Sequence, residues 1–118
     1  MHASILIVDE SPAVRDLLRE FFADEGFLVE IARADAEAWE NIRRRPPSAV
    51  VLERHGPVGK WLLERVRSVP DLAVVVTTTY AGLEPIDDIP VVVKPFDLDD
   101  LARLVWDRLR PADQEMTG

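Results

Sequence analysis

The apolar run at residues 48–53 constrains this chain more than any other feature, because it is short, carries two β-branched valines and ends abruptly in the carboxylate of Glu53. It follows two prolines at positions 46 and 47, so it fits a buried strand better than a helix. Buried strands of this kind belong to parallel sheets that are covered on both faces. Because ligands of such sheets bind beyond the carboxyl ends of the strands, we expect Glu53 to lie at the functional edge.

The rest of the chain alternates short β-branched runs with segments whose apolar residues recur at helical spacing. Four further strands are expected at residues 5–8, 27–32, 72–76 and 91–93. Four helices are expected at residues 12–25, 35–45, 61–66 and 97–109. The apolar residues of the first and third helices are Val14, Leu17, Leu18, Phe21, Phe22, Trp61, Leu62 and Val66. The residues predicted to face inward from the second and last helices are Ala36, Trp39, Ile42, Leu98, Leu101, Val105 and Leu109. Alternating strands and helices predict an α/β fold with a doubly wound, five-stranded parallel sheet.

The charge balance argues against two classes of partner. The chain has 22 acidic and 14 basic residues, a net charge of -8, and such a surface repels nucleic-acid phosphates and anionic lipids. The chain has no cysteine, as expected in a reducing compartment, and no apolar run approaches the length of a membrane span. We therefore expect a cytoplasmic domain at residues 1–110 that binds neither nucleic acid nor membrane, followed by a polar tail or linker at residues 111–118.

Charged and hydroxyl side chains follow four of the five predicted strands, where the sheet would bring them together. They are Asp9 and Glu10, Glu53, Thr78, and Lys94. Three carboxylates suit a hard divalent cation with oxygen ligands. A hydroxyl and an ammonium suit the oxygens of a phosphoryl group. The combination indicates a site for phosphoryl transfer, although each residue alone would be ordinary.

This pattern resembles the receiver domain of two-component response regulators, and the resemblance covers nearly the whole chain. It is carried by residues 5–12, Pro57, Thr78 and residues 94–96, which occur in the family's order. The resemblance implies a flavodoxin-like fold and a cis peptide bond before Pro95. It also implies that Asp9 and Glu10 hold Mg²⁺ and that Thr78 and Lys94 contact the phosphoryl oxygens.

Three departures from the family pattern affect the switching machinery. Glu53 stands where the family has the aspartate that receives a phosphoryl group from a histidine kinase. Val91 stands where the family usually has an aromatic residue that moves together with the threonine. The chain between Thr78 and Lys94 is also shorter than usual by roughly six residues, more than one helical turn of about 3.6 residues. We therefore expect the family's fourth helix to be replaced by a loop or a single turn.

These departures favour an atypical receiver, or pseudo-receiver, that works as a protein-interaction module without aspartyl phosphorylation and without catalytic turnover. Its partner would be a histidine kinase or a downstream signalling protein, and a homodimer is a further option. An active receiver that is phosphorylated at Glu53 is the main alternative. A flavodoxin-like domain that binds a nucleotide or flavin is the second, although the sequence has no glycine-rich phosphate loop.

The length of the Glu53 side chain leads to a geometric prediction. A glutamate at this position should reach the Lys94 ammonium, with the two charged groups roughly 2.7 to 3.2 Å apart. Mg²⁺ could still bind to Asp9, Glu10 and Glu53, but weakly, because Lys94 would already engage Glu53.

Overall fold

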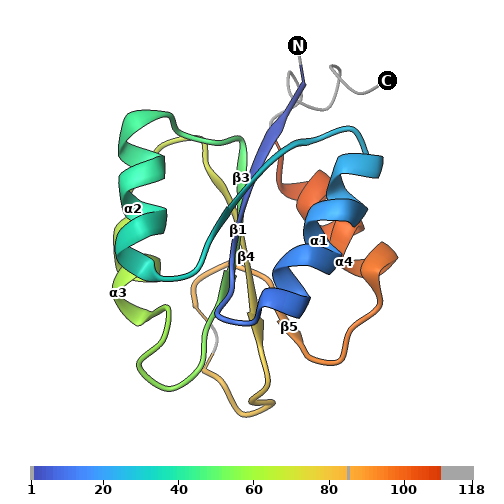
Figure 1. The fold of residues 1–118 in the computed structure, drawn as a ribbon. Coiled ribbons are helices and arrows are strands. Elements are labelled where there is room, and N and C mark those ends of the chain that lie inside the picture. Colours follow the sequence, from blue (N-terminus) through green and yellow to red (C-terminus); the bar gives the residue numbers. More distant parts are fainter. Residues whose placement is uncertain (1, 85, 110–118) are drawn as a thin grey trace.

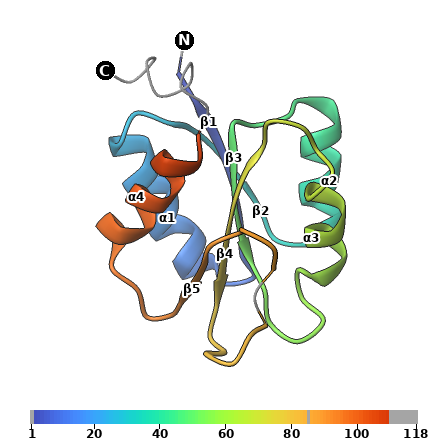
Figure 2. The same ribbon diagram turned by 180° about the vertical axis from the view of Figure 1, so that it is seen from behind.

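The computed structural model describes residues 2–84 and 86–109, which form a parallel sheet between two layers of helices. The strands are β1 (Ser4–Val8), β2 (Leu28–Ala32), β3 (Ala49–Glu53), β4 (Ala73–Thr78) and β5 (Val91–Val93), and their order in the sheet is β2-β1-β3-β4-β5. The helices are α1 (Pro12–Asp24), α2 (Asp35–Arg44), α3 (Lys60–Val66) and α4 (Leu98–Arg108). Helices α2 and α3 cover one face, and α1 and α4 cover the other (Figures 1 and 2). This confirms the predicted doubly wound, flavodoxin-like fold.

The core consists of two clusters, one on each face of the sheet. Because side chains alternate along a strand, odd-numbered residues such as Ile7, Val51 and Val75 pack under α1 and α4. Even-numbered residues such as Val50 and Val76 pack under α2 and α3. Both faces are therefore buried, which explains why the central strands are continuous apolar runs.

The helices begin where the sequence places their caps. The Ser11 side chain accepts a hydrogen bond from the Val14 N–H at 3.3 Å, and Pro12 is the first residue of α1. The Asp97 carboxylate accepts a hydrogen bond from the Asp99 N–H at 2.8 Å at the start of α4. These caps fix the two helices that flank the carboxyl ends of β1 and β5.

Several predicted details were wrong. Ala36, which was predicted to face inward, lies at the surface. Two apolar residues of the first and third helices, Leu17 and Trp61, are 51% and 40% exposed. In their helices, Ala38 and Leu63 are buried instead, because the inward stripe lies one or two positions further along. Strand β4 also continues beyond the predicted end at residue 76, and this changes the register of the threonines that follow.

The connection between β4 and β5 contains no helix among its described residues, 79–84 and 86–90, which confirms the predicted loss of the family's fourth helix. It has two turns, the second closed by a bridge between Ile86 and Ile89. No helix within the described part of the chain combines the length and apolarity needed to cross a membrane. The tail predicted at residues 111–118 lies outside the described residues.

Candidate functional site

Lys94 joins two carboxylates at the carboxyl edge of the sheet. Its Nζ donates to Asp9 Oδ2 at 2.8 Å and to Glu53 Oε2 at 2.9 Å. The side chains of Asp9, Glu53 and Lys94 are only 3%, 13% and 16% exposed. The predicted pair between Glu53 and Lys94 is thus confirmed, as is the cis peptide bond before Pro95. The additional bond to Asp9 was not predicted.

The remaining carboxylate oxygens are bound by backbone donors. Asp9 Oδ1 accepts a hydrogen bond from the Ser11 N–H at 2.9 Å, and Glu53 Oε1 accepts one from the Glu10 N–H at 3.2 Å. All four oxygens of the two carboxylates therefore have a donor within the protein. Within the described residues, no buried side-chain nitrogen or oxygen lacks a hydrogen-bond partner.

Arg15 is a buried cation at this edge, and the sequence analysis missed it. Its guanidinium Nη1 donates to the Asp9 carbonyl at 2.8 Å and to the Glu10 carbonyl at 3.0 Å. Arg15 is 9% exposed, so the turn between β1 and α1 wraps around its guanidinium. Both hydrogen bonds of this guanidinium go to backbone carbonyls, so Arg15 adds a buried positive charge beside the site, while Lys94 is the cation that pairs with the carboxylates of Asp9 and Glu53.

The environment of Lys94 keeps its ammonium charged. Burial alone would lower the pKa of Lys94, but hydrogen bonds and charge attraction from Asp9 and Glu53 outweigh that effect and raise the pKa above its ordinary value of 10.5. At neutral pH the site therefore contains a permanent internal cation between two carboxylates.

The predicted cation ligands Asp9, Glu10 and Glu53 do not form a three-carboxylate cluster. The Glu10 side chain is exposed, and only its backbone contacts the site. Among the residues that the structure describes, no three acidic, histidine or cysteine side chains are grouped as a metal site requires. A divalent cation here would have to compete with the Lys94 ammonium for Asp9 and Glu53, so binding of Mg²⁺ stays a prediction.

The strand register identifies Thr77 as a second hydroxyl at this edge. Thr77 is paired with Glu53 in the register of β3 and β4, and alternation places it on the same sheet face as Val75. Thr78 alternates to the other face, and its Oγ1 accepts the Tyr80 N–H at 3.1 Å. A phosphoryl contact through Thr78 stays a prediction. Thr77 was missed because three threonines follow one another and β4 runs further than expected.

A tight turn after β3 fixes the position of Glu53. Gly59 has a φ of 82°, and a Cβ atom there would lie 2.0 Å from the Glu53 carbonyl oxygen. The Arg54 guanidinium donates to the carbonyls of Gly56 and Val58, while the Arg54 N–H donates to the Thr77 carbonyl at 2.7 Å. The turn therefore packs directly against the backbone of the site.

Val91, the residue at the predicted switch position, begins the short strand β5. It pairs with Val76 and packs against the cluster under α2 and α3. A valine presents no ring that could swing between a buried and an exposed position, so this strand offers no aromatic reporter. The role of Val91 in switching stays a prediction.

Comparison with known proteins finds relatives of this chain, although no family model matches it. The chain is 29% identical over 110 residues to sporulation initiation phosphotransferase F of Bacillus subtilis, covering 86% of this chain and 89% of the relative. It is 35% identical over 111 residues to response regulator MprA of Mycobacterium sp. strain KMS, covering 86% of this chain and 48% of the relative. The chain thus spans about half the length of that response regulator.

Solved structures agree with these relatives. A CheY-like response regulator receiver domain protein from Methanospirillum hungatei superposes with a TM-score of 0.83 at 27% identity, covering 100% of both chains. Response regulator TrrA from Thermotoga maritima, in complex with Mg²⁺ and BeF, gives a TM-score of 0.79 at 27% identity and covers 91% of this chain and 99% of that one.

Proposed function

This chain belongs to the response-regulator receiver family of two-component and phosphorelay signalling, and from that premise we propose that it is an atypical receiver whose state is not set by phosphorylation. The observation that carries the proposal is the Lys94 ammonium, which bridges Asp9 and Glu53 at 2.8 and 2.9 Å. In this arrangement the lysine that would meet a phosphoryl group is already bound by the residue that would receive it.

The length of Glu53 also opposes phosphoryl transfer. In-line attack on phosphorus depends on placement of the nucleophile, and an error of about 1 Å can cost on the order of 100-fold in rate. The extra methylene of glutamate moves the carboxylate further from the strand than aspartate would. Each Glu53 oxygen already accepts one hydrogen bond, and these two bonds restrict the directions from which either oxygen could attack phosphorus.

The Glu53 carboxylate instead takes part of the role of a phosphorylated aspartate. It supplies one negative charge to Lys94, where a phosphate would supply about 1.5 to 2. It is therefore a partial mimic that holds the end of β3 to the end of β5 at all times. The domain needs no phosphodonor to keep this contact.

Mg²⁺ fits this site poorly while the ammonium is in place. Asp9 and Glu53 are the carboxylates that would hold the ion, and it would supply charge neutralisation to an incoming phosphoryl group. The Lys94 ammonium already pairs with both carboxylates, so we expect weak Mg²⁺ binding. The solved complex with Mg²⁺ and BeF shows that the Thermotoga maritima regulator binds these groups, and it says nothing about the affinity of this chain for Mg²⁺.

We expect the domain to act by binding a histidine kinase or a downstream signalling protein in the cytoplasm, without turning over a substrate. The connection between β4 and β5 is the surface that differs most from the family pattern, since it lacks a helix among its described residues. A homodimer would be a second form of the same interaction function.

Exchange of Glu53 for aspartate tests whether a switch survives. We expect Glu53→Asp with Mg²⁺ and beryllofluoride to change hydrogen exchange only near the site, with little change at residues 80–91 or around Trp106. A ligand shifts a conformational equilibrium only if it binds one of the two states better than the other. Val91 replaces the aromatic residue that would move together with the threonine, so the second state has no such residue to stabilise it. Amide exchange measured with and without beryllofluoride gives the result.

Wild-type protein under the same conditions is the control for non-specific effects of the salt. Large coordinated changes that reach α4 in Glu53→Asp would mean that the switch works without its aromatic residue. The proposal of a non-switching module would then have to be withdrawn.

A further inference from the structure

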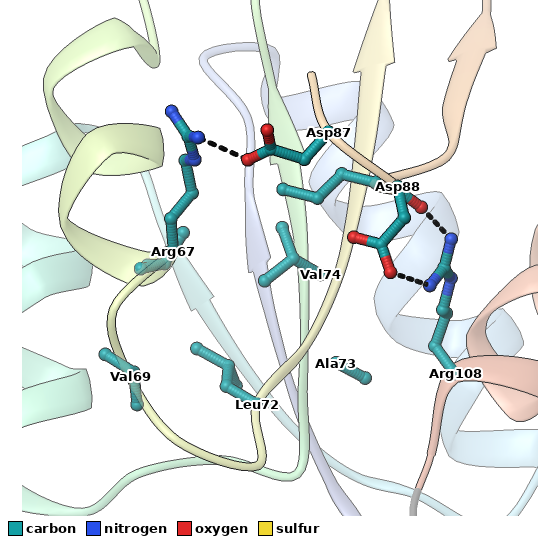
Figure 3. A pocket seen from close by; sticks show the side chains of 10 residues that line it. Arg67, Val69, Leu72, Ala73, Val74, Asp87, Asp88 and Arg108 are labelled. Carbon is teal, nitrogen blue, oxygen red and sulfur yellow. Dashed lines mark hydrogen bonds and ion pairs between the residues drawn. The ribbon is translucent and has the colours of Figure 1, made fainter. Parts of the chain in front are cut away.

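The turn at residues 86–89 connects the two helical layers across the edge of the sheet. Asp87 forms an ion pair with Arg67, the residue that caps the C-terminus of α3. The next residue, Asp88, pairs with Arg108 at the end of α4, with Nη1 3.2 Å from Oδ2. Figure 3 shows the two arginines approaching the turn from opposite sides. Because α3 and α4 cover opposite faces of the sheet, the turn is a strap between them.

Beneath this strap, the edge of β4 lacks a neighbouring strand. Strand β5 pairs only with residues 76–78 of β4, so the first half of β4 has no strand beside it on that side. The Val76 N–H donates to the Pro90 carbonyl at 2.9 Å, which shows that even-numbered residues of β4 direct their backbone groups towards β5. The Val74 backbone therefore faces the same side, where it forms no hydrogen bond within the described residues.

A hollow of about 210 Å³ lies at this free edge. Val74, Leu72 and Val69 form its apolar wall, and the two Arg–Asp pairs form its rim (Figure 3). It occupies the place where the connection between β4 and β5 has no helix to cover the sheet. An unpaired strand edge is a template for pairing with another extended chain.

The two ion pairs that close the strap are exposed and therefore weak. The side chains of Arg67 and Asp87 are 45% and 59% exposed, and those of Arg108 and Asp88 are 35% and 86% exposed. Exposed pairs typically contribute about 0 to 1 kcal/mol each, so another carboxylate can exchange with the side chain of Asp87 or Asp88 at little cost. The Arg108 guanidinium also donates to the Asp88 carbonyl, and this bond can stay in place. The arginines would remain in place as the recognition groups.

We propose that this strap covers a docking site for an extended acidic segment of a partner protein, which adds as a short strand beside Val74 and takes Arg67 and Arg108 from Asp87 and Asp88. Strand addition supplies the backbone hydrogen bonds, and the two arginines select carboxylates. The strap itself is a model for such a segment, because it presents two consecutive carboxylates between apolar residues and the two arginines bind these carboxylates. The inference rests on the proposed interaction function and names the surface that performs it.

The test is titration of the full chain with two short peptides at about 0.15 M salt, where charges more than about 8 Å apart are largely screened. One peptide is acetyl-Val-Asp-Asp-Ile-Val-amide, whose two consecutive acids point to opposite faces of an added strand, and the other has lysine at both aspartate positions. We expect the acidic peptide to bind and to shift the Val74 amide resonance. The net charge of -8 favours the basic peptide in general, so preference for the acidic one reports the local arginines.

Two double variants separate the strap from the recognition groups. Asp87→Asn with Asp88→Asn should raise the affinity for the acidic peptide about three- to tenfold, the equivalent of one or two exposed ion pairs. Arg67→Gln with Arg108→Gln should lower it by a similar factor and remove the preference over the basic peptide. Glu84→Gln is the matched control, because Glu84 is an exposed acid of the same connection with no ion pair within the described residues. It should leave the affinity unchanged.

Equal binding of both peptides, no shift at Val74, or an unchanged affinity in the Asp87/Asp88 variant would overturn the docking site. Self-association of that variant in place of peptide binding would also overturn it, since the occupant would then be a second copy. Circular dichroism of each variant confirms that the fold is kept. None of these measurements uses a phosphodonor, so their failure leaves the proposal for Glu53 standing.

Discussion

Lys94→Met should destabilise the domain by about 2–4 kcal/mol, somewhat less than the roughly 3–5 kcal/mol usual for a fully buried ion pair, because Lys94 and Glu53 are only part-buried. The substitution keeps most of the side-chain volume but leaves the carboxylates of Asp9 and Glu53 without their shared cation, and these side chains are only 3% and 13% exposed. The expected fall in melting temperature is about 10 to 20 °C. Urea unfolding of the variant and the wild type measures the difference in the free energy of unfolding.

Lys60→Met is the matched control, because Lys60 is an exposed lysine at the start of α3 and forms no ion pair within the described residues. It should change the free energy of unfolding by less than about 0.5 kcal/mol. Adding Glu53→Gln to Lys94→Met should recover part of the loss, since it removes one of the two unpaired charges. Equal stability of the two lysine variants would contradict the buried ion-pair account.

The stability that the ion pairs of Lys94 contribute to the fold should disappear at alkaline pH. The folded-state pKa of Lys94 is raised above 10.5, while the unfolded value is about 10.4. The ion pairs therefore stabilise the fold fully below the unfolded pKa, and the contribution is lost as the pH rises through the folded pKa. The difference between wild type and Lys94→Met should be constant from neutral pH to about pH 10 and should narrow only above pH 10.5.

Gly59→Ala should cost about 2–5 kcal/mol, from the strain of a left-handed alanine together with a backbone clash. The φ of Gly59 is 82°, and the added Cβ would lie 2.0 Å from the Glu53 carbonyl oxygen. The clash cannot be relieved by turning a side chain, because the contacted atom belongs to the backbone. It should displace Glu53, weaken its pair with Lys94 and lower the pKa of Lys94 towards its ordinary value.

Gly26→Ala separates strain from clash. Gly26 has a φ of 99°, but a Cβ there would meet no atom within 4 Å. Its substitution should therefore cost only the conformational strain, about 1–2 kcal/mol. Urea unfolding of both variants, with an NMR titration of the Lys94 ammonium, distinguishes the two contributions. Equal costs and an unchanged Lys94 pKa would show that the turn does not position Glu53.

The sheet and part of the site could be predicted from local patterns. The β-branched runs identify all five strands, because only a sheet covered on both faces accepts such continuous apolar segments. The charged residues that end them identify Glu53 and Lys94, because parallel strands deliver their carboxyl ends to one edge. The contact between the Glu53 carboxylate and the Lys94 ammonium could be predicted because a glutamate side chain is long enough to reach the lysine.

Other parts of the site depend on contacts that local patterns do not contain. Arg15 occupies a helical position of ordinary appearance, and its burial follows only from the turn that wraps around it. Thr77 faces Glu53 because of the register between β3 and β4, which three consecutive threonines leave undetermined in the sequence. The strap at Asp87 and Asp88 depends on arginines 20 residues away along the chain in each direction.

The central claim is that Glu53 does not accept a phosphoryl group, and the intact mass of the protein tests it most directly. The protein is incubated with Mg²⁺ and acetyl phosphate or phosphoramidate, with Glu53→Gln treated in parallel to identify modification elsewhere. The account predicts an unchanged mass for both proteins, because the longer side chain of Glu53 misplaces the nucleophile and its Oε2 is already bound by Lys94. A stable gain of one phosphoryl group in the wild type that is absent from Glu53→Gln would contradict it.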